Sequence, residues 1–422
     1  MVPKLRLSLF KDDKSSRWSL AKLGEIVEFK KGKGISKSDI SKNGVYPCVR
    51  YGELYTIYNE KIDKVLSKTN CAPNEHVISK SGDILIPASG ENAVDIARAS
   101  AILRDDVILG GDINILSPKS NSLNSLFLSY SIVGKKKMEL AKMAQGNSVV
   151  HLYSSQLKTL EIWLPLIDEQ TRVAEFLSSV DEKITLLDKQ YKQLCQYKKG
   201  MMQKIFSQQL RFKDDSGDDF SDWEEVELKK IASKVKSKNR DNSVSTVLTN
   251  SATLGIVCQE SYFEREIVTE SNLTGYYVVE IGDFVYNPRI SSTAPVGPIK
   301  LNELSQGVMS PLYTVFRFNK GLLKFYQYFF ESSVWHDYMK SVANSGARHD
   351  RMNISGADFF DLPIPQPSDE EQTKIARFLS AIDNKITTNK AKLDKLKIWK
   401  QGLLQQMFVE NSLDMANFRS VK

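Results

Sequence analysis

The sequence predicts an α+β protein in which two mixed α/β domains have a pseudo-two-fold arrangement and are separated by two long antiparallel helices forming a coiled coil. Three observations lead to this fold class. The chain repeats itself at an offset of 202 residues, each repeat ends in a long segment with apolar residues spaced by four and three, and the remainder mixes strand-like and helical patterns. A duplicated chain favours a pseudo-two-fold molecule.

The repeat is clearest in the two long helical segments. Of the 39 positions from Glu169 to Ser207, 16 are identical to the residue 202 positions later, beginning with the Glu-Gln-Thr triplets at Glu169 and Glu371. Matches outside the helices include Phe10–Asp13 with Phe212–Asp215, Trp18 with Trp223, and Gly82-Asp83 with Gly282-Asp283. The domain interiors between these anchors differ. We infer a common frame that carries two unlike domains.

The repeat sets the expected domain limits. We expect a first domain at residues 1–163, a central long helix at 164–210, a second domain at 211–362, a C-terminal long helix at 363–410 and a tail at 411–422. Strand-like runs lie at Gly82–Pro87, Val107–Leu116, Tyr276–Tyr286 and Leu312–Phe318. Helical patterns lie at Leu123–Ala144 and Leu322–Ala343.

Each long helix places its apolar residues on one seam, which calls for a helical partner. The seam residues are Leu177, Val180, Ile184, Leu187 and Leu194 in the first helix and Leu379, Ile382, Ile386, Leu393 and Leu396 in the second. One interpretation is that each helix packs on its own domain. We favour antiparallel pairing of the two helices, because the second domain must fold back between them. Thirty-odd helical residues give a rod of about 50 Å.

Three polar residues interrupt the seams. Asn389 stands where the first helix has Leu187, and a polar residue at such a position often fixes the register of a helix pair at a cost in stability. Lys198 and Lys400 interrupt the two seams at equivalent points. We expect their long side chains to direct the ammonium groups outward into water.

The composition is that of a soluble globular protein, with 41% hydrophobic and 26% charged residues. No run of about 18 apolar residues could span a bilayer, and the first residues lack the apolar core of a signal peptide. The four cysteines have no paired spacing, so we expect reduced thiols and a cytoplasmic location. Of the net charge of +7, residues 1–163 alone contribute +7 and residues 211–362 contribute −4. The basic first domain suggests an anionic partner.

At the starts of its two long helices, the chain resembles the specificity subunits of type I restriction–modification systems. The resemblance rests on Ile162–Thr171 and Leu362–Thr373, where a Pro-marked exit leads to Glu-Gln-Thr, and on the Phe-Leu-Ser, Asp-x-Lys-Ile-Thr and Lys-x-Gly segments that follow each. Through this frame it covers essentially the whole chain, whereas the domain interiors are variable in that family. It implies two target-recognition domains, each reading one half of a split double-stranded DNA target, with the paired helices fixing the spacing.

The resemblance also implies partners and cofactors. The subunit itself carries no chemistry in that family. It recruits methyltransferase subunits, expected to be two, which use S-adenosylmethionine to methylate adenine, and ATP-dependent restriction subunits join them. We therefore expect no cofactor on this chain, with S-adenosylmethionine, ATP and magnesium on partner subunits alone.

Catalytic motifs are missing from the sequence. An adenine methyltransferase needs an Asn/Asp-Pro-Pro-aromatic tetrapeptide, and the nearest segment, Asn287–Ile290, lacks the second proline and the aromatic residue. Gly32-Lys33-Gly34 lacks the third glycine of a phosphate-binding loop. The four histidines do not have the spacing of metal ligands. We expect a non-catalytic chain without a metal site.

Polar loops and basic runs recur at equivalent positions in the two domains. Arg289 corresponds to Ser89, and Asn344–Arg351 corresponds to the loop Gln145–His151. Cations suit phosphates, and Arg, Asn and Ser suit base edges. The candidate DNA-binding residues are Lys30, Lys31, Lys33, Arg50, Tyr51, Ser89, Asn92, Asn147 and His151 in the first domain and Lys236, Lys238, Arg240, Arg289, Ser291, Ser292, Arg348, His349 and Arg351 in the second.

Two other classes of function stay open. A coiled-coil interaction protein without DNA readout would need neither the basic first domain nor the recurring polar loops. Any single lysine among the candidates could also be an ordinary solvated surface charge. A stand-alone methyltransferase with a duplicated recognition domain would need the missing tetrapeptide, which argues strongly against it.

We predict that Arg348→Ala and Arg351→Ala each weaken binding to the specific DNA site while leaving assembly with the methyltransferase subunits intact. The physical reason is the loss of a cation and of five N–H donors from a loop that faces DNA. Gel-shift affinities measure the effect. Affinities unchanged by both substitutions would contradict this assignment.

Overall fold

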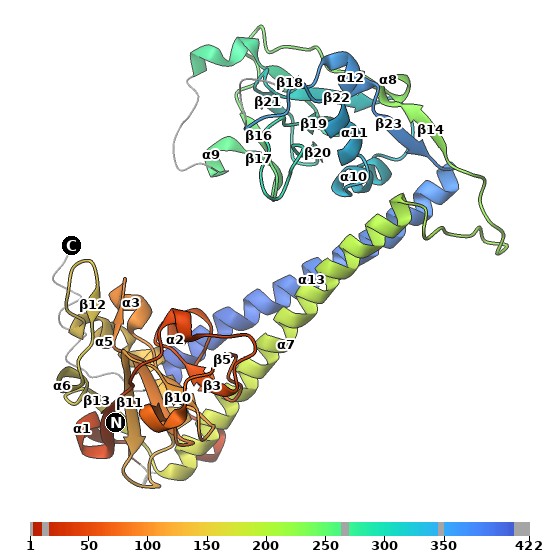
Figure 1. Ribbon diagram of the computed structural model, residues 1–422. Coiled ribbons are helices and arrows are strands. Elements are labelled where there is room, and N and C mark those ends of the chain that lie inside the picture. The colour runs from red at the N-terminus through yellow and green to blue at the C-terminus, as the bar shows by residue number, and fades with distance from the viewer. Residues whose placement is uncertain (1–2, 11–16, 263–269, 345–349, 409–422) are drawn as a thin grey trace. The chain divides into compact units, whose positions relative to one another are not determined.

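The computed structural model describes residues 3–10, 17–262, 270–344 and 350–408. The chain divides into two compact units (Figure 1): unit 1 contains Met1–Asp188 and Ala391–Lys422, and unit 2 contains Lys189–Lys390. The long helices α7 (Ile167–Phe206) and α13 (Asp369–Met407) both run through this division. Each unit therefore combines part of both helices with one α/β module: module 1 (residues 17–166) or module 2 (residues 207–262, 270–344 and 350–368).

Module 1 is built on a sheet with the strand order β2-β11-β7-β9-β4. Its strands are β2 (Val27–Lys31), β11 (Ile113–Pro118), β7 (Asp83–Pro87), β9 (Ser100–Ile102) and β4 (Lys61–Ile62). Every residue of β7 is buried, as expected for a strand covered on both faces. A second sheet has the order β5-β3-β10-β6, formed by β5 (Ser67–Thr69), β3 (Tyr46–Val49), β10 (Ile108–Leu109) and β6 (Val77–Ile78).

Two short strand pairs and several short helices complete module 1. β1 (Ser19–Lys22) pairs with β13 (Glu161–Leu164), and β8 (Ser89–Gly90) pairs with β12 (Val150–His151). The helices are α1 (Leu23–Ile26), α2 (Glu53–Thr56), α3 (Ala93–Ile96), α4 (Ser125–Ser131), α5 (Lys137–Met143) and α6 (Ser154–Leu157). The β1–β13 pair brings the two ends of the module together at the start of α7.

Module 2 repeats this frame with different contents. Its main sheet has the order β15-β22-β19-β20, from β15 (Ala232–Lys234), β22 (Thr314–Phe318), β19 (Phe284–Tyr286) and β20 (Ile299–Leu301). The strand pairs are β14 (Glu224–Glu227) with β23 (Pro363–Gln366), β16 (Leu248–Ser251) with β17 (Gly255–Cys258), and β18 (Tyr277–Val279) with β21 (Gly307–Met309). The helices are α8 (Leu228–Ile231), α9 (Gln259–Tyr262), α10 (Leu323–Glu331), α11 (His336–Ser341) and α12 (Gly356–Phe360).

The structure interrupts four elements that the sequence predicts as continuous. The run Val107–Leu116 is β10 and β11 with a turn at Gly110-Gly111, and Tyr276–Tyr286 is β18 and β19. The predicted helix Leu123–Ala144 is α4 and α5 joined by a π-helical turn at Ile132–Lys136. The predicted helix Leu322–Ala343 is α10 and α11, with a break after Glu331. These runs are apolar because both flanking elements are buried, so hydrophobicity alone does not reveal the turns.

The repeated Gly-Asp motif is a turn that leads into β7 and β19. Gly82 and Gly282 both have φ of +94°, a conformation that glycine adopts without steric cost. The next residue is buried in both modules: Asp83 accepts hydrogen bonds from Lys80 N and Ser117 Oγ, and Asp283 accepts a bidentate pair from Arg317. The motif therefore fixes where each central strand begins.

The repeated Glu-Gln pair anchors the start of each long helix to its own unit. Glu169 is almost fully buried and accepts from Arg6 Nε at 2.7 Å and Arg6 Nη2 at 2.6 Å. Glu371 is fully buried and accepts from Arg211 Nη2 and Trp223 Nε1, both at 2.8 Å. These charge-assisted hydrogen bonds offset the cost of removing the two carboxylates from water.

The glutamine that follows each glutamate binds backbone. Gln170 accepts from Asn124 N and donates to Pro165 O, and Gln372 accepts from Leu322 N and donates to Pro367 O. Asn124 and Leu322 are the N-cap residues of α4 and α10. The motif thus joins the start of a long helix to the start of a module helix.

Within each unit, parts of α7 and α13 pack against each other. In unit 1, Val173, Leu177 and Val180 share one buried cluster with Leu403, Leu404 and Met407. In unit 2, Lys198 pairs with Asp383 and Gln190 with Asn389, so the helices run antiparallel there. Of the seam residues, Leu177, Val180, Leu379, Ile382 and Leu393 are buried, and Ile184, Leu187, Leu194, Ile386 and Leu396 are partly buried. None of the described helices is long and apolar enough to cross a membrane.

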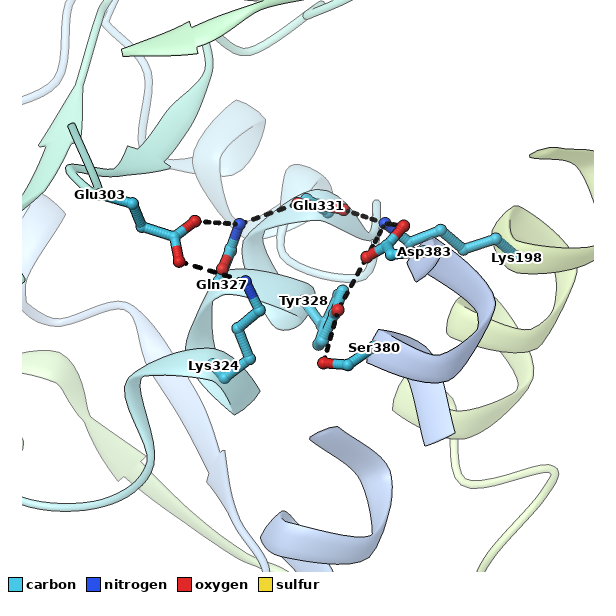
Figure 2. Close-up of polar contacts among 8 residues, drawn as sticks. All are labelled: Lys198, Glu303, Lys324, Gln327, Tyr328, Glu331, Ser380 and Asp383. Atoms are coloured by element: carbon cyan, nitrogen blue, oxygen red, sulfur yellow. Dashed lines mark hydrogen bonds and ion pairs between the residues drawn. The ribbon is translucent and has the colours of Figure 1, made fainter. Parts of the chain in front are cut away.

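The prediction that Lys198 and Lys400 point outward is wrong. Only 14% of each side chain is exposed. Lys198 Nζ lies 2.7 Å from Asp383 Oδ1 and 2.8 Å from Glu331 Oε2 (Figure 2), and Lys400 Nζ lies 2.7 Å from Asp181 Oδ1 and 2.9 Å from Glu60 Oε2. Two carboxylates around each ammonium compensate its loss of water.

Asn389 makes a polar contact across the seam in unit 2. Its Nδ2 donates to Gln190 Oε1 at 2.7 Å, while its buried Oδ1 has no hydrogen-bond partner among the described residues. A half-satisfied buried amide costs stability, and an alignment without an acceptor opposite Nδ2 would leave that atom unpaired as well. Asn389 therefore favours this alignment over its alternatives.

We predict that Glu371→Leu lowers the free energy of unfolding by about 2–3 kcal/mol, because it leaves the Arg211 guanidinium and the Trp223 N–H without their shared acceptor. Urea denaturation checks the value. The control is Glu370→Leu, which removes an exposed carboxylate next to Glu371 and is expected to change stability by less than about 0.5 kcal/mol. Equal effects of the two substitutions would contradict an anchoring role for Glu371.

Candidate nucleic-acid interface

In module 1, two loops that are distant in sequence meet at the end of β7. The β8–β12 pair places His151 opposite Ser89, and Gln145 forms a further bridge to His151. The His151 ring stacks against Tyr153 with 6.1 Å between ring centroids. The structure thereby joins the turn after β7 and the loop Gln145–His151 into one surface.

The basic residues of module 1 lie near the same end of the sheet. Lys31 on β2 is opposite Asn114 on β11, which is in turn opposite Ile86 on β7. Two strand spacings separate Lys31 from β7, or about 10 Å. Lys33 N donates to Leu109 O at the end of β10, and Gly110 N of the same peptide donates to Val49 O. Lys33 therefore lies on one side of β10, and Arg50, which follows Val49, lies on the other. Lys30, Lys31 and Lys33 are exposed.

Several residues of module 1 that the sequence predicts to bind DNA make contacts within the module instead. Ser89 is 3% exposed, and the Asn92 side chain accepts from Val94 N as the N-cap of α3. Arg50 Nη2 lies 3.7 Å from the buried Glu53, and the Tyr51 ring packs 6.3 Å from Tyr55. Asn147 is exposed. His151, Asn147 and the three lysines are therefore the better placed of the predicted contacts.

Module 2 uses the same loop pairing with different side chains. Arg289 lies opposite Arg351, and the pairing is completed by hydrogen bonds from Ile290 N to Asp350 O and from Met352 N to Pro288 O. Like charges directly opposite each other are destabilising in a strand pair. An anion bound between the two guanidinium groups would relieve that repulsion, so this position suits a phosphate or another electron-rich group.

The two arginines line a pocket of about 650 Å³ together with Asn250, Tyr276 and Tyr313. Asn250 is 3% exposed, its Nδ2 donates to Val285 O and Pro298 O, and its Oδ1 has no partner among the described residues. Arg351 Nε is likewise buried without a hydrogen bond, with Asp350 Oδ2 at 3.6 Å. A buried unpaired polar atom costs about 1–3 kcal/mol. The pocket is thus lined by two residues, Asn250 and Arg351, that each have a polar atom without a hydrogen bond, and amide and guanidinium side chains suit the edge of a nucleobase.

The basic run of module 2 lies beside this pocket. Lys236, Lys238 and Arg240 are exposed, and Lys238 Nζ sits 5.5 Å from the centroid of the Tyr277 ring. Asn239 N donates to Tyr276 O, which puts the run next to a residue of the pocket. Ser291 Oγ accepts from Ala294 N in a turn, and Ser292 is exposed. Arg348 and His349 lie outside the described residues.

Sequence reasoning missed the polar floor of this pocket. Asn250 stands in a strand without any motif, and Tyr276 and Tyr313 read as ordinary strand residues. Asn287 lies in the loop after β19, and its Nδ2 donates to Asn250 O. Side-chain hydrogen bonds connect Asn250 to segments distant in sequence, at Val285, Pro298 and Asn287, and nothing in the local spacing predicts such contacts. In the described ranges, no three His, Cys, Asp or Glu side chains gather in a way that could hold a metal ion.

The chain matches a protein-family model described as the type I restriction modification DNA specificity domain, over residues 15–196 and again over 220–397. Two proteins of Methanocaldococcus jannaschii are similar to it. The type I restriction enzyme MjaVIII specificity subunit is 26% identical over 408 residues, covering 92% of this chain and 91% of the relative. The putative type I restriction enzyme MjaX specificity subunit is 26% identical over 416 residues, covering 92% of each.

Solved structures have a similar fold. The crystal structure of a type I restriction–modification S subunit from M. genitalium aligns with a TM-score of 0.59 at 17% identity, covering 98% of this chain and 100% of the other. A chain from a structure of type I system assembly and conformational transition aligns with a TM-score of 0.54 at 16% identity, covering 93% and 97%. Both support the two-domain, mixed helix and sheet fold.

We predict that Arg289→Ala and Arg351→Ala affect DNA binding differently. If exposed Arg289 contacts a phosphate, its removal weakens all sequences alike and lowers the slope of log affinity against log salt by about 0.9. If Arg351 reads a base from within the pocket, its removal costs about 1–3 kcal/mol on the specific site and little on random DNA. Salt titrations by fluorescence anisotropy separate the two effects.

The control for both variants is Lys320→Ala. Lys320 is exposed and follows β22 at the opposite end from Thr314, which pairs with Tyr286 close to the arginine pocket. A loss of affinity in Lys320→Ala equal to that of the arginine variants would indicate general charge rather than a defined site.

Proposed function

This chain belongs to the type I restriction–modification DNA specificity family, and we propose that it reads a bipartite, gapped target in double-stranded DNA. One observation carries the proposal. The same loop pairing occurs in both modules, but it presents Arg289 opposite Arg351 in one and Ser89 opposite His151 in the other. A common frame with unlike side chains at equivalent positions is what two readers of different half-sites require.

We propose that residues 1–163 and 211–362 are the two target-recognition domains and that the long helices form an antiparallel coiled coil between them. The helix contacts within each unit support the pairing, because the same apolar seam is buried in both. Such a coiled coil would act as a spacer, holding the two readers a fixed number of base pairs apart. The helices of this family would then set the gap in the target.

In the second domain, exposed side chains and pocket side chains would have different roles in DNA binding. The exposed cations Lys236, Lys238 and Arg240 would neutralise phosphates, which positions the domain without selecting a sequence. Arg351 and Asn250, whose Nε and Oδ1 atoms lack a hydrogen bond in the free chain, would test the hydrogen-bonding edge of a base at the pocket that they line. A base that paired with these atoms would remove a cost that the free chain already carries, and a base that did not pair would leave that cost in place, so the two bases would differ in binding free energy.

The chain would have no catalytic role of its own. We propose that it assembles with methyltransferase subunits, expected to be two, and with restriction subunits, as the resemblance implies. S-adenosylmethionine, ATP and magnesium would then be bound by those partners. The relatives are named specificity subunits, which supports a recognition role.

The test is genome-wide sequencing of adenine methylation in cells that express this chain with a companion methyltransferase subunit. We expect a gapped motif with two half-sites. A motif in the absence of the companion would indicate a stand-alone enzyme, and no motif with it would favour an interaction protein without DNA readout.

A pair of matched substitutions sharpens the test. Arg351→Ala is expected to relax the base preference in one half of the motif, and His151→Ala, at the equivalent position of module 1, in the other half. The gap between the halves should stay the same in both variants. Changes in both halves from a single substitution would contradict separate readers.

A further inference from the structure

A lysine in unit 2 joins three elements at one point. Lys198 on α7 pairs with Asp383 on α13 at 2.7 Å and with Glu331, the last residue of α10 in module 2, at 2.8 Å. Tyr328 on α10 donates to Asp383 Oδ2 at 2.7 Å, and its ring lies 4.9 Å from Lys198 Nζ. Figure 2 shows the ammonium between the two carboxylates, with Tyr328 beside them. One ammonium therefore holds both long helices and the module.

Unit 1 contains the same arrangement with the two helices exchanged. Lys400 on α13 pairs with Asp181 on α7 at 2.7 Å and with Glu60 of module 1 at 2.9 Å. Tyr130 on α4 donates to Asp181 Oδ2 at 2.7 Å, and its ring lies 5.6 Å from Lys400 Nζ. The Lys and Asp positions belong to the repeated frame, but Glu60 and Glu331 do not: one precedes β4 and the other ends α10. Two unrelated acids complete the same junction.

Each junction contacts a strand, β9 in module 1 or β20 in module 2, that pairs with the strand leading to the candidate DNA-binding loop. In module 1, Glu60 O accepts from Ala101 N of β9, and β9 pairs with β7, which leads to Ser89. In module 2, Gln327 Nε2 lies 3.5 Å from Glu331 and 3.4 Å from Glu303, which follows β20 (Figure 2). β20 pairs with β19, which leads to Arg289. A short chain of contacts thus links each ammonium to a reading loop.

The two junctions are expected to add little to stability, but they restrict how the module and the two helices are arranged around each lysine. Burial lowers the pKa of Lys198, but Glu331 and Asp383 raise it further, so the net pKa lies above the ordinary lysine value. The pKa of Lys400 is raised in the same way, with Glu60 and Asp181 overcoming burial. Buried ion pairs roughly offset their own desolvation cost, and apolar replacements often match their stability. What they impose is one arrangement of the groups that carry the charges.

We propose that Lys198 and Lys400 are positioning residues that fix the orientation of each recognition module on the paired helices, and thereby the gap length that the protein accepts in its DNA target. This inference rests on the proposed reading of a gapped target. With Glu331 or Glu60 neutralised, the helix pair keeps its Lys–Asp contact, while the module loses its ion pair with the lysine and keeps the tyrosine hydrogen bond to the aspartate at that junction. The module would then adapt to half-sites displaced by one base pair.

The experiment measures methylation by the complex with its companion methyltransferase subunit. Substrates are DNA duplexes that carry the motif methylated by the wild-type complex, with its gap unchanged or altered by one base pair in either direction. Glu331→Gln and Glu60→Gln are the test variants, since each is nearly isosteric and leaves the lysine paired with aspartate. Glu370→Gln, an exposed carboxylate on α13, is the matched control.

We expect methylation of altered-gap duplexes, relative to the native gap, to rise about tenfold in both test variants and not in the control, a change of about 1.4 kcal/mol in relative preference. Base preference within each half-site should be unchanged. An equal loss at every gap length, or an unaltered ratio, would overturn the inference and leave a structural role. If one variant does not fold, the other decides, because the two act in different units. A wild-type complex without any gapped motif would instead refute the proposed function.

Discussion

The structure depends on one constraint: each long helix carries an apolar stripe whose exposure to water is unfavourable, and one module covers only part of that stripe. The other long helix covers a further part, because the duplicated chain provides a second helix with the same stripe running in the opposite direction. In unit 1, Val173 and Leu177 share a cluster with Leu403 and Met407, and in unit 2, Ile205 shares one with Ile375 and Leu379. Burial of these stripes is non-directional, so it brings the helices together without selecting how they align.

Buried polar groups determine which alignment of the two helices is favoured. The buried Glu169 and Glu371 attach the helix starts through Arg6 and Arg211, and Asn389 favours one alignment. The lysine junctions add the modules to the same arrangement. Each of these groups is expensive to bury unpaired, so wrong arrangements are penalised more strongly than the right one is rewarded. Apolar burial sets the strength of the frame, and buried polar groups set its geometry.

The main sheets of the two modules have four equivalent strands in the same order, and the modules share their Gly-Asp turns, but they differ where the loops meet. Arginine pairing in one and a serine–histidine pair in the other give unlike chemistry at equivalent places. Stability resides in the common frame, so the loop residues are free to differ without endangering the fold. That separation would allow one architecture to carry loops of different chemistry.

The sequence alone determined the duplication, the long helices and their seams, because these depend on spacings within a continuous segment that local periodicity reports. It also placed Arg289 and Arg351 at positions equivalent to Ser89 and His151. Tertiary structure decided what each polar residue contacts. The outward direction expected for Lys198 was wrong because Glu331 and Asp383, far away in sequence, supply its counter-charges. Asn250 became a pocket residue through side-chain hydrogen bonds to Val285 O and Pro298 O, which are distant in sequence. Such contacts depend on how elements pack, which no local pattern in the sequence encodes.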